Sequence, residues 1–244
     1  MTSDTTLRGT GEPIRPREPS PRRFWRLPGV YPPQSDTRLL ARTLVAEAIE
    51  PGTRVLDIGA GTGYLSVSAA LAGSRNVTAV DVDKRALLNT RLNATLNGVQ
   101  VRAVRGYLTK PFAENDFDLV VSNPPYVPAA EDTLPTGGLA RCWDAGRNGR
   151  AYLDQICREA ARILRPDGVL LLLQSELSDI AATRTELQRH GLSTDIVSTE
   201  HVPFGPVLTE RAPLLRRRGL LGPDDDLEKL VVFRAVNRGA MTAG

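Results

Sequence analysis

Short runs of aliphatic residues alternate along this chain with segments whose apolar residues recur at helical spacing. The runs are continuously apolar rather than alternating, as at Arg54–Ile58, Phe117–Ser122 and Val169–Gln174. Strands that are apolar on both sides are typical of a parallel sheet covered by helices on both faces. The order therefore predicts an α/β fold with a doubly wound, mostly parallel, Rossmann-like sheet, and 244 residues suffice for one such domain.

The remaining periodic segments complete this predicted sheet. Four further strands are expected at Val77–Val80, Val101–Arg105, Asp195–Glu200 and Leu230–Val236, which makes seven strands in all. Helices are expected at 36–50, 64–72, 84–96, 150–164 and 178–190, the first with Asp36 as a candidate N-cap. The last two strands follow each other without a full helix between them. This predicts an antiparallel last strand, with residues 203–229 as an insertion.

The N-terminal segment differs in composition from the rest. Residues 1–29 are rich in Pro and Arg and lack apolar periodicity, which predicts a flexible arm before a single domain at 30–244. Arginines cluster in the arm and again in the insertion, at Arg15, Arg17, Arg22, Arg23, Arg26, and at Arg211, Arg216, Arg217, Arg218. We interpret both clusters as solvated surface, with contact to nucleic acid or to an acidic protein as the alternative.

Several functional classes are disfavoured by the composition. The two cysteines, Cys142 and Cys157, form no Cys-x-x-Cys pair, so we expect neither a zinc site nor a disulfide framework. The longest aliphatic run, Val169–Leu173, is too short to cross a bilayer, and no run of signal-peptide length opens the chain. We therefore expect a cytoplasmic protein without a membrane partner.

A glycine-rich turn follows the first predicted strand. Asp57 precedes Gly59, Gly61 and Gly63, and a small-residue helix begins directly afterwards. Glycines at alternate positions allow a sharp turn and let a ligand approach backbone N–H groups at a helix N-terminus. The spacing Gly-x-Gly-x-Gly departs from the dinucleotide pattern and favours S-adenosylmethionine as the ligand. Asp57 would accept a hydrogen bond from the amino group of its methionine part. A tight turn without a ligand is the alternative interpretation.

An acidic residue ends the second strand at the position where such folds bind ribose. Asp81 stands about 20 residues after the glycine turn, as expected for a group that accepts from ribose hydroxyls. Helix capping is the alternative for an acid at this position, although Asp83 is the better placed cap.

The fourth strand runs into Asn123-Pro124-Pro125-Tyr126. Two prolines fix the backbone and remove two donors, so the Asn123 amide oxygen and a nearby carbonyl are left as adjacent acceptors. Such a pair fits the two hydrogens of a planar –NH₂ group, and Tyr126 can stack on its flat face. Holding both hydrogens localises the nitrogen lone pair toward a methyl donor without a strong base. A proline-rich turn is the alternative.

With these motifs the chain resembles the HemK-type protein-glutamine methyltransferases, in the short branch that lacks an N-terminal helical domain. The resemblance covers roughly Val30 to Val236 and includes an entry motif at Tyr31–Leu40 and a Gly-Arg-Asn-Gly segment within Trp143–Arg150. It implies catalysis by Asn123, Pro124, Pro125 and Tyr126. It implies cofactor contacts from Thr37, Asp57, Gly59, Ala60, Gly61, Gly63, Asp81, Val82, Tyr107, Leu108 and Asn123.

One position departs from the family pattern. Relatives carry an acid after the third strand that receives the adenine amino group, and Tyr107 occupies that place here. Tyr107 can border the adenine but cannot accept as a carboxylate does. We therefore expect weaker cofactor binding, or a substitute such as Asp116 or a main-chain group.

The resemblance implies methylation of the glutamine in the Gly-Gly-Gln loop of translation release factors. In eukaryotes, short-branch members work with a small zinc-binding partner and also act on lysine. The residues themselves leave three alternatives open: an adenine N-methyltransferase on RNA or DNA, a small-molecule N-methyltransferase with 203–229 as a lid, and a non-catalytic binding module. Release factor is the expected protein substrate.

Overall fold

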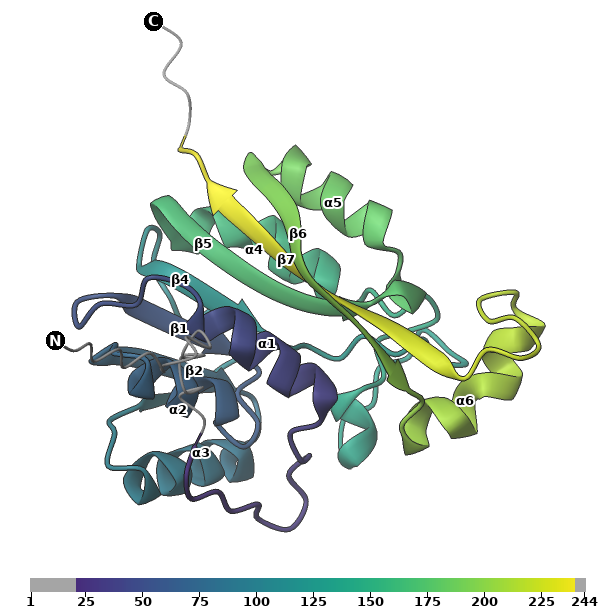
Figure 1. The fold of residues 1–244 in the computed structure, drawn as a ribbon, viewed down its shortest axis with the longest axis horizontal. Coiled ribbons are helices and arrows are strands. Elements are labelled where there is room, and N and C mark those ends of the chain that lie inside the picture. Colours follow the sequence, from purple (N-terminus) through teal and green to yellow (C-terminus); the bar gives the residue numbers. More distant parts are fainter. Residues whose placement is uncertain (1–20, 240–244) are drawn as a thin grey trace, which may run out of the picture.

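A computed structural model describes residues 21–239 and contains one seven-stranded sheet in the order β3-β2-β1-β4-β5-β7-β6 (Figure 1). The strands are β1 Arg54–Ile58, β2 Asn76–Asp81, β3 Arg102–Arg105, β4 Phe117–Ser122, β5 Leu164–Ser175, β6 Leu192–Pro203 and β7 Leu227–Asn237. Only β7 is antiparallel, and it lies between β5 and β6. The predicted doubly wound sheet with an antiparallel last strand is thus confirmed.

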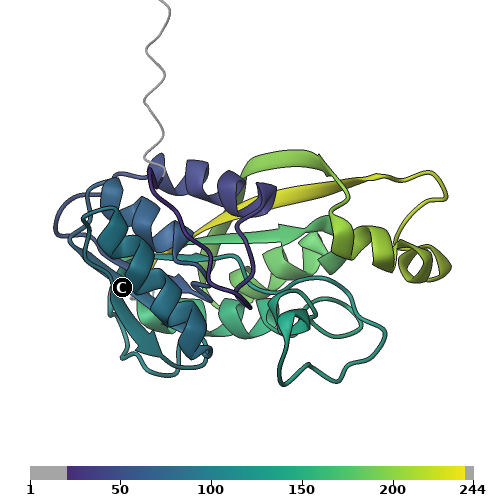
Figure 2. The ribbon, with the colours of Figure 1, turned by 90° about the horizontal axis from the view of Figure 1, so that it is seen from below.

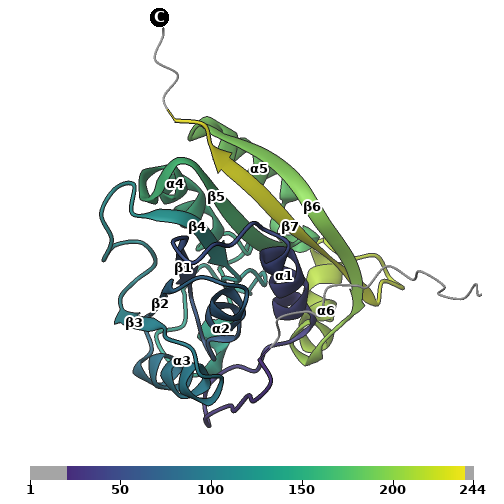
Figure 3. The same ribbon diagram turned by 60° about the vertical axis from the view of Figure 1, so that its left-hand side comes forward.

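Residues 21–239 form six α-helices, of which the first five cover the sheet (Figure 1), and two short 3₁₀ helices. They are α1 Ser35–Val45, α2 Tyr64–Leu71, α3 Lys84–Leu96, α4 Leu153–Ile163, α5 Ile180–Arg189 and α6 Pro206–Arg217, with η1 Leu139–Cys142 and η2 Glu176–Ser178. Helices α1 to α3 lie in front of the sheet in Figure 3, and α4 and α5 lie behind it. Figure 2 shows the same layers edge-on. The central strands are buried on both faces, as their aliphatic sequences require.

The hairpin of β6 and β7 is longer than the sequence predicts. Pairing runs from Leu192–Asn237 to Pro203–Leu227, so the connection is reduced to residues 204–226. Polar residues alternate along β6 because one face of this edge strand is exposed to solvent. This pattern made the ends of the strand difficult to predict from the sequence. The expected insertion contains α6, which begins with Pro206 at a favourable first position.

Two predicted helix starts were wrong. Helix α1 begins at Ser35 with Gln34 as its N-cap, so Asp36 lies inside the first turn and its side chain is free for other contacts. Helix α4 begins at Leu153 rather than Arg150, because Gly149 has a φ of +72° and Ala151 and Tyr152 form a turn before the helix. Both differences place polar side chains near the carboxyl edge of the sheet.

Residues 21–27, which belong to the expected flexible arm, lie along α3. Three asparagines four residues apart, two on α3 and the third at its C-cap, bind the backbone of this strap. Asn89 accepts from Leu27 N–H, Asn93 accepts from Trp25 N–H at 2.8 Å, and Asn97 accepts from Arg22 N–H. The amide nitrogens of all three donate to strap carbonyls. Residues 1–20 of the arm lie outside the described residues.

Asn93 also joins the strap to the glycine turn, because its fully buried amide donates to the Thr62 carbonyl at 2.9 Å. We expect Asn93→Ala to lower the free energy of unfolding by about 2 kcal/mol, since it leaves several backbone groups without partners. Hydrogen exchange at the Trp25 and Leu27 amides should accelerate. Asn97→Ala, at the exposed end of the ladder, is the control and should have less effect. Unchanged exchange in Asn93→Ala would contradict this account of the strap.

Candidate active site

A cavity of about 450 Å³ opens at the carboxyl edge of the sheet. One side is formed by the glycine turn after β1 and by the end of β2, and another by the 123–127 segment after β4. The chain from Gly29 to Thr37, which joins the strap to α1, covers it. The segments Val202–Leu208 and Glu228–Leu230 close the far end. This edge of an open α/β sheet is where ligands bind.

The glycine turn exposes its backbone to the cavity. Gly59 and Gly61 have φ values of +75° and +55°, and a Cβ on either residue would meet nothing closer than 3.9 Å. Gly63, at +79°, instead packs against Thr90, whose Cα would lie 2.8 Å from an added Cβ. The first two glycines therefore permit close approach of a ligand, and the third permits close packing of α2 on α3.

Asp81 lies at the cavity wall beside this turn. Its carboxylate accepts from Gly61 N–H at 3.0 Å and from Asp83 N–H at 2.8 Å, which fixes its orientation. Burial raises the pKa of Asp81 above its usual value. Val82 and Ala60 also line the cavity, together with Thr37.

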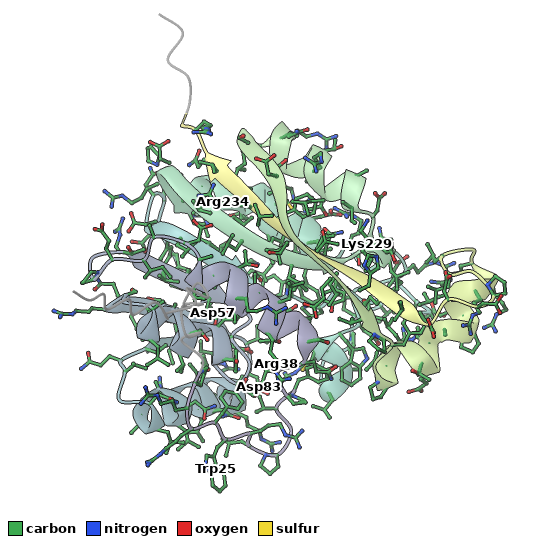
Figure 4. The ribbon with its side chains drawn as sticks, in the orientation of Figure 1. Trp25, Arg38, Asp57, Asp83, Lys229 and Arg234 are labelled. Carbon is green, nitrogen blue, oxygen red and sulfur yellow. The ribbon has the colours of Figure 1, made fainter. Side chains whose placement is uncertain are left out.

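Asp57 lies behind the turn and is not among the residues that line the cavity. Its side chain is fully buried, and one oxygen accepts from both the N–H and the hydroxyl of Ser66, at 3.0 and 2.5 Å. Burial raises its pKa to about 7. The structure therefore places Asp57, near the end of β1, against Ser66 in the first turn of α2 (Asp57 is labelled in Figure 4).

Tyr107 and Leu108 line the end of the cavity next to β3. The Tyr107 hydroxyl donates to Gln155 Oε1 at 3.1 Å and so is directed toward α4. Asp116 was proposed as a substitute for the missing acid, and the structure contradicts this. Asp116 precedes β4 and pairs with Arg54 at the start of β1, which is the opposite edge of the sheet.

Asn123 is held by α1. Its amide nitrogen donates to Asp36 Oδ2 at 3.0 Å and to Thr37 Oγ1 at 3.2 Å. No described residue donates to its amide oxygen, and Asn123 lines the cavity with Pro124 and Pro125. Fixing the nitrogen determines which way the carboxamide is turned, so that its oxygen remains as the acceptor.

Tyr126 is buried, with 8% of its surface exposed, although it also borders the cavity. Its hydroxyl donates to the same Asp36 oxygen at 3.2 Å, and burial together with Asp36 raises its pKa well above the usual value. Asp36 thus joins Asn123 and Tyr126 through one carboxylate. No pattern in the sequence marks this contact, because Asp36 precedes its two partners by 87 and 90 residues.

The Gly-Arg-Asn-Gly segment supports the 123–127 corner from below. A Cβ on Gly149 would overlap the Tyr126 carbonyl oxygen and lie 2.9 Å from Ser178 Oγ. That hydroxyl donates to the same carbonyl at 2.6 Å, and Arg150 donates to the Ser178 carbonyl at 2.5 Å. Val127 forms an isolated parallel bridge with Asp144. The segment therefore positions the corner by direct contact.

The arginines of the second cluster mostly bind within the protein. Arg211 donates to Pro128 O and pairs with Asp144 at 2.8 Å, and Arg218 donates to the carbonyls of Ala129 and Ala130. Arg216 donates to carbonyls in the turn after α6. These contacts fasten α6 to the loop that follows the Asn-Pro-Pro-Tyr corner. They leave little of this cluster for a nucleic-acid partner.

Glu228, which sequence reasoning missed, lines the far end of the cavity. Only 8% of its surface is exposed, and burial raises its pKa to about 7 from 4.5. Asp36 and Glu176 raise it further, whereas the Ser175 hydroxyl lowers it. Glu228 follows a run of polar residues in the sequence, and this pattern is typical of the end of a loop rather than of a buried site.

The raised pKa of Glu228 has a consequence for stability. Between about pH 4.5 and 7 the folded protein holds a proton that the unfolded chain releases, so stability falls as pH rises through this range. Glu228→Gln should therefore raise the free energy of unfolding at pH 8 by about 2 kcal/mol and change it little at pH 5. Thermal unfolding at both pH values measures this. Equal effects at pH 5 and pH 8 would contradict the assignment.

Among residues 21–239, no group of three His, Cys, Asp or Glu side chains is arranged to hold a metal ion. Cys142 and Cys157 are free thiols. Within the same part of the chain, no helix has the length and apolarity to cross a membrane.

Comparison with known proteins places this site in a class. Residues 22–137 match the family model described as methyltransferase small domain. A candidate protein N5-glutamine methyltransferase of Methanocaldococcus jannaschii is 32% identical over 76% of this chain and 92% of its own length. The release factor glutamine methyltransferase of Shewanella oneidensis is 34% identical over 62% of this chain, which spans 57% of that relative.

Among solved structures, the Mtq2–Trm112 complex of E. cuniculi matches 85% of this chain and 98% of its own, with a TM-score of 0.59 and 24% identity. That complex is responsible for the methylation of the eRF1 translation termination factor. The fold and the comparisons define the class: the chain is an S-adenosylmethionine-dependent methyltransferase. Within the class it belongs to the HemK-type protein-glutamine methyltransferase family, as its motifs predicted.

Proposed function

We propose that this protein methylates the side-chain amide nitrogen of a glutamine in a protein, with a translation release factor as the substrate. The observation that carries the proposal is the clamped carboxamide of Asn123. Asp36 and Thr37 hold its nitrogen, and its oxygen is left as an acceptor beside the glycine turn. The relatives named as glutamine methyltransferases support the same reaction.

The cavity walls fit S-adenosylmethionine, which when bound supplies an activated methyl group on a sulfonium. Asp81 would accept from ribose hydroxyls, and the open backbone at Gly59 and Gly61 would receive the amino-acid end. Tyr107, Leu108 and Val82 line the part that suits the adenine ring. Asp57 would act on the cofactor only indirectly, by fixing the start of α2 through Ser66.

The acceptor nitrogen needs positioning more than it needs a base. An amide lone pair is delocalised, so the nitrogen is a poor nucleophile until its hydrogens are held out of plane. Asn123 Oδ1 and the Pro124 carbonyl would accept these two hydrogens and favour a pyramidal nitrogen facing the methyl group. The acceptor nitrogen would lose one amide proton to water when it takes the methyl group that bound S-adenosylmethionine would supply, and S-adenosylhomocysteine would be released.

The charge of the cavity favours a protein over a nucleic-acid acceptor. Among the described residues, four acids line it, Asp36, Asp81, Asp83 and Glu228, whereas the one lining basic side chain is Arg141, which pairs with Asp83. A phosphate backbone would be repelled at such a mouth. The alternative of an adenine acceptor is disfavoured for this reason.

Mass spectrometry of purified release factor tests the proposal. After incubation with labelled S-adenosylmethionine, we expect a mass gain of one methyl group on the peptide that contains Gly-Gly-Gln. A release factor with that glutamine replaced by alanine is the control and should gain no label. A folded enzyme that binds the cofactor but leaves the wild-type peptide unlabelled would contradict the proposal.

A further inference from the structure

Glu228 lies at the far end of the cavity, and its side-chain carboxyl is buried. Among the described residues at this end, it is the one acid with a buried oxygen that has no hydrogen-bond partner. One oxygen interacts with the Ser175 hydroxyl, whereas Oε1 is buried without a hydrogen bond. Glu228 lies in β7 opposite Val202 of β6, and both residues line the cavity. A buried carboxyl without a hydrogen-bond partner destabilises the folded state. Packing alone therefore does not explain why Glu228 lies at a ligand cavity.

The groups that face Glu228 make the missing partner a cation. Asp36 on α1 and Glu176 in η2 both act on it electrostatically, and both are acids. The hydroxyls of Tyr31 and Tyr126 also lie within its electrostatic reach. The one lining base, Arg141, is already paired with Asp83. A negative, largely buried site of this kind is stabilised by a positively charged N–H donor that comes with the ligand.

We propose that Glu228 is a specificity-determining residue that binds a positively charged side chain of the acceptor protein, close to the methylated glutamine. This inference rests on the proposed function, because it assumes a peptide acceptor held at Asn123. Glu228 would pair with a lysine or arginine of the acceptor, while Asn123 holds the amide. The preferred acceptor is then a glutamine with basic neighbours, and acidic neighbours are disfavoured.

Two peptides test the inference. Both are acetylated and amidated and carry a central Gly-Gly-Gln, flanked on each side by arginine in one and by glutamate in the other. Arginine replaces lysine so that methylation of the flank cannot confuse the readout. KM is measured for each peptide, and Kd is measured by fluorescence anisotropy with S-adenosylhomocysteine present, which reports binding without turnover.

The matched variants are Glu228→Gln and Glu114→Gln. Each removes one negative charge, but Glu114 is exposed and lies outside the cavity lining. The wild type should prefer the arginine-flanked peptide by about tenfold in both KM and Kd. Glu228→Gln should reduce this preference to below about threefold, and Glu114→Gln should retain it. In the wild type the preference should shrink from pH 8 to pH 6, as Glu228 gains a proton.

Each result decides one question. A wild-type enzyme without preference, or Glu228→Gln with the full wild-type preference, would overturn the role of Glu228 and leave the proposed function standing. If the wild type methylated neither peptide nor release factor, the proposed function would fall, and the acceptor role of Glu228 with it. Cofactor binding should be equal in all three proteins and shows that each is folded.

Discussion

Asn123→Ala is expected to lower kcat for glutamine methylation at least about 1000-fold while cofactor affinity stays within a few fold. The substitution removes the oxygen that would hold an amide hydrogen of the acceptor. It also leaves Asp36 and Thr37 without the amide nitrogen that both now accept from. Single-turnover kinetics measure the chemical step, and calorimetry with S-adenosylhomocysteine measures cofactor binding.

The control for Asn123→Ala is Asn76→Ala. Asn76 is exposed at the amino end of β2, and its side-chain amide donates to the Pro51 and Gly52 carbonyls, on the opposite edge of the sheet. It should retain wild-type kcat. If Asn123→Ala transferred methyl groups at a rate within tenfold of the wild type, the assignment of Asn123 would be incorrect.

Gly149→Ala is expected to damage both stability and activity. The methyl group would overlap the Tyr126 carbonyl at a φ of +72°, so the corner after β4 has to move. Left-handed strain and overpacking together should cost about 3 kcal/mol, or about 8 °C in Tm for a chain of this size. The displaced corner should lower kcat about 100-fold, because small misplacements of positioning groups are expensive.

Gly98→Ala separates these two causes. Gly98 follows the C-cap of α3 with a similar φ of +67°, but a Cβ there would meet nothing within 4 Å. It should lose about 1 kcal/mol through strain alone and keep its activity. If both variants behaved alike in Tm and in kcat, the close contact between Gly149 and Tyr126 would not be what supports the corner.

The sheet was predictable because its signals are local. Continuous aliphatic runs identify the central strands, and the glycine turn with Asp81 identifies the edge that binds a ligand. The prediction was less accurate at β6, where polar residues on the solvent-facing side hide the strand. It also failed at Asp36, whose acidic side chain near a helix start has the pattern of an N-cap but binds Asn123 and Tyr126 instead.

The candidate site was only partly predictable because several of its contacts join distant segments. Glu228 and Asp36 come from opposite ends of the chain and meet only through the fold, so no spacing in the sequence marks them. The strap shows the same limit. Its proline and arginine content predicted a flexible arm, whereas residues 21–27 find partners on Asn89, Asn93 and Asn97. A single sequence shows the asparagines but not which backbone groups they bind. Among these groups are those of Trp25, which is labelled at the bottom of Figure 4.

The central claim is that the Asn123 oxygen holds the acceptor amide next to the methyl-donor position. A crystal structure with S-adenosylhomocysteine and a Gly-Gly-Gln peptide measures this directly. We expect the glutamine nitrogen within hydrogen-bonding distance of Asn123 Oδ1 and the Pro124 carbonyl, facing the cofactor sulfur. A peptide amide bound elsewhere, or a cofactor whose sulfur faces away from the Asn123 corner, would contradict the account.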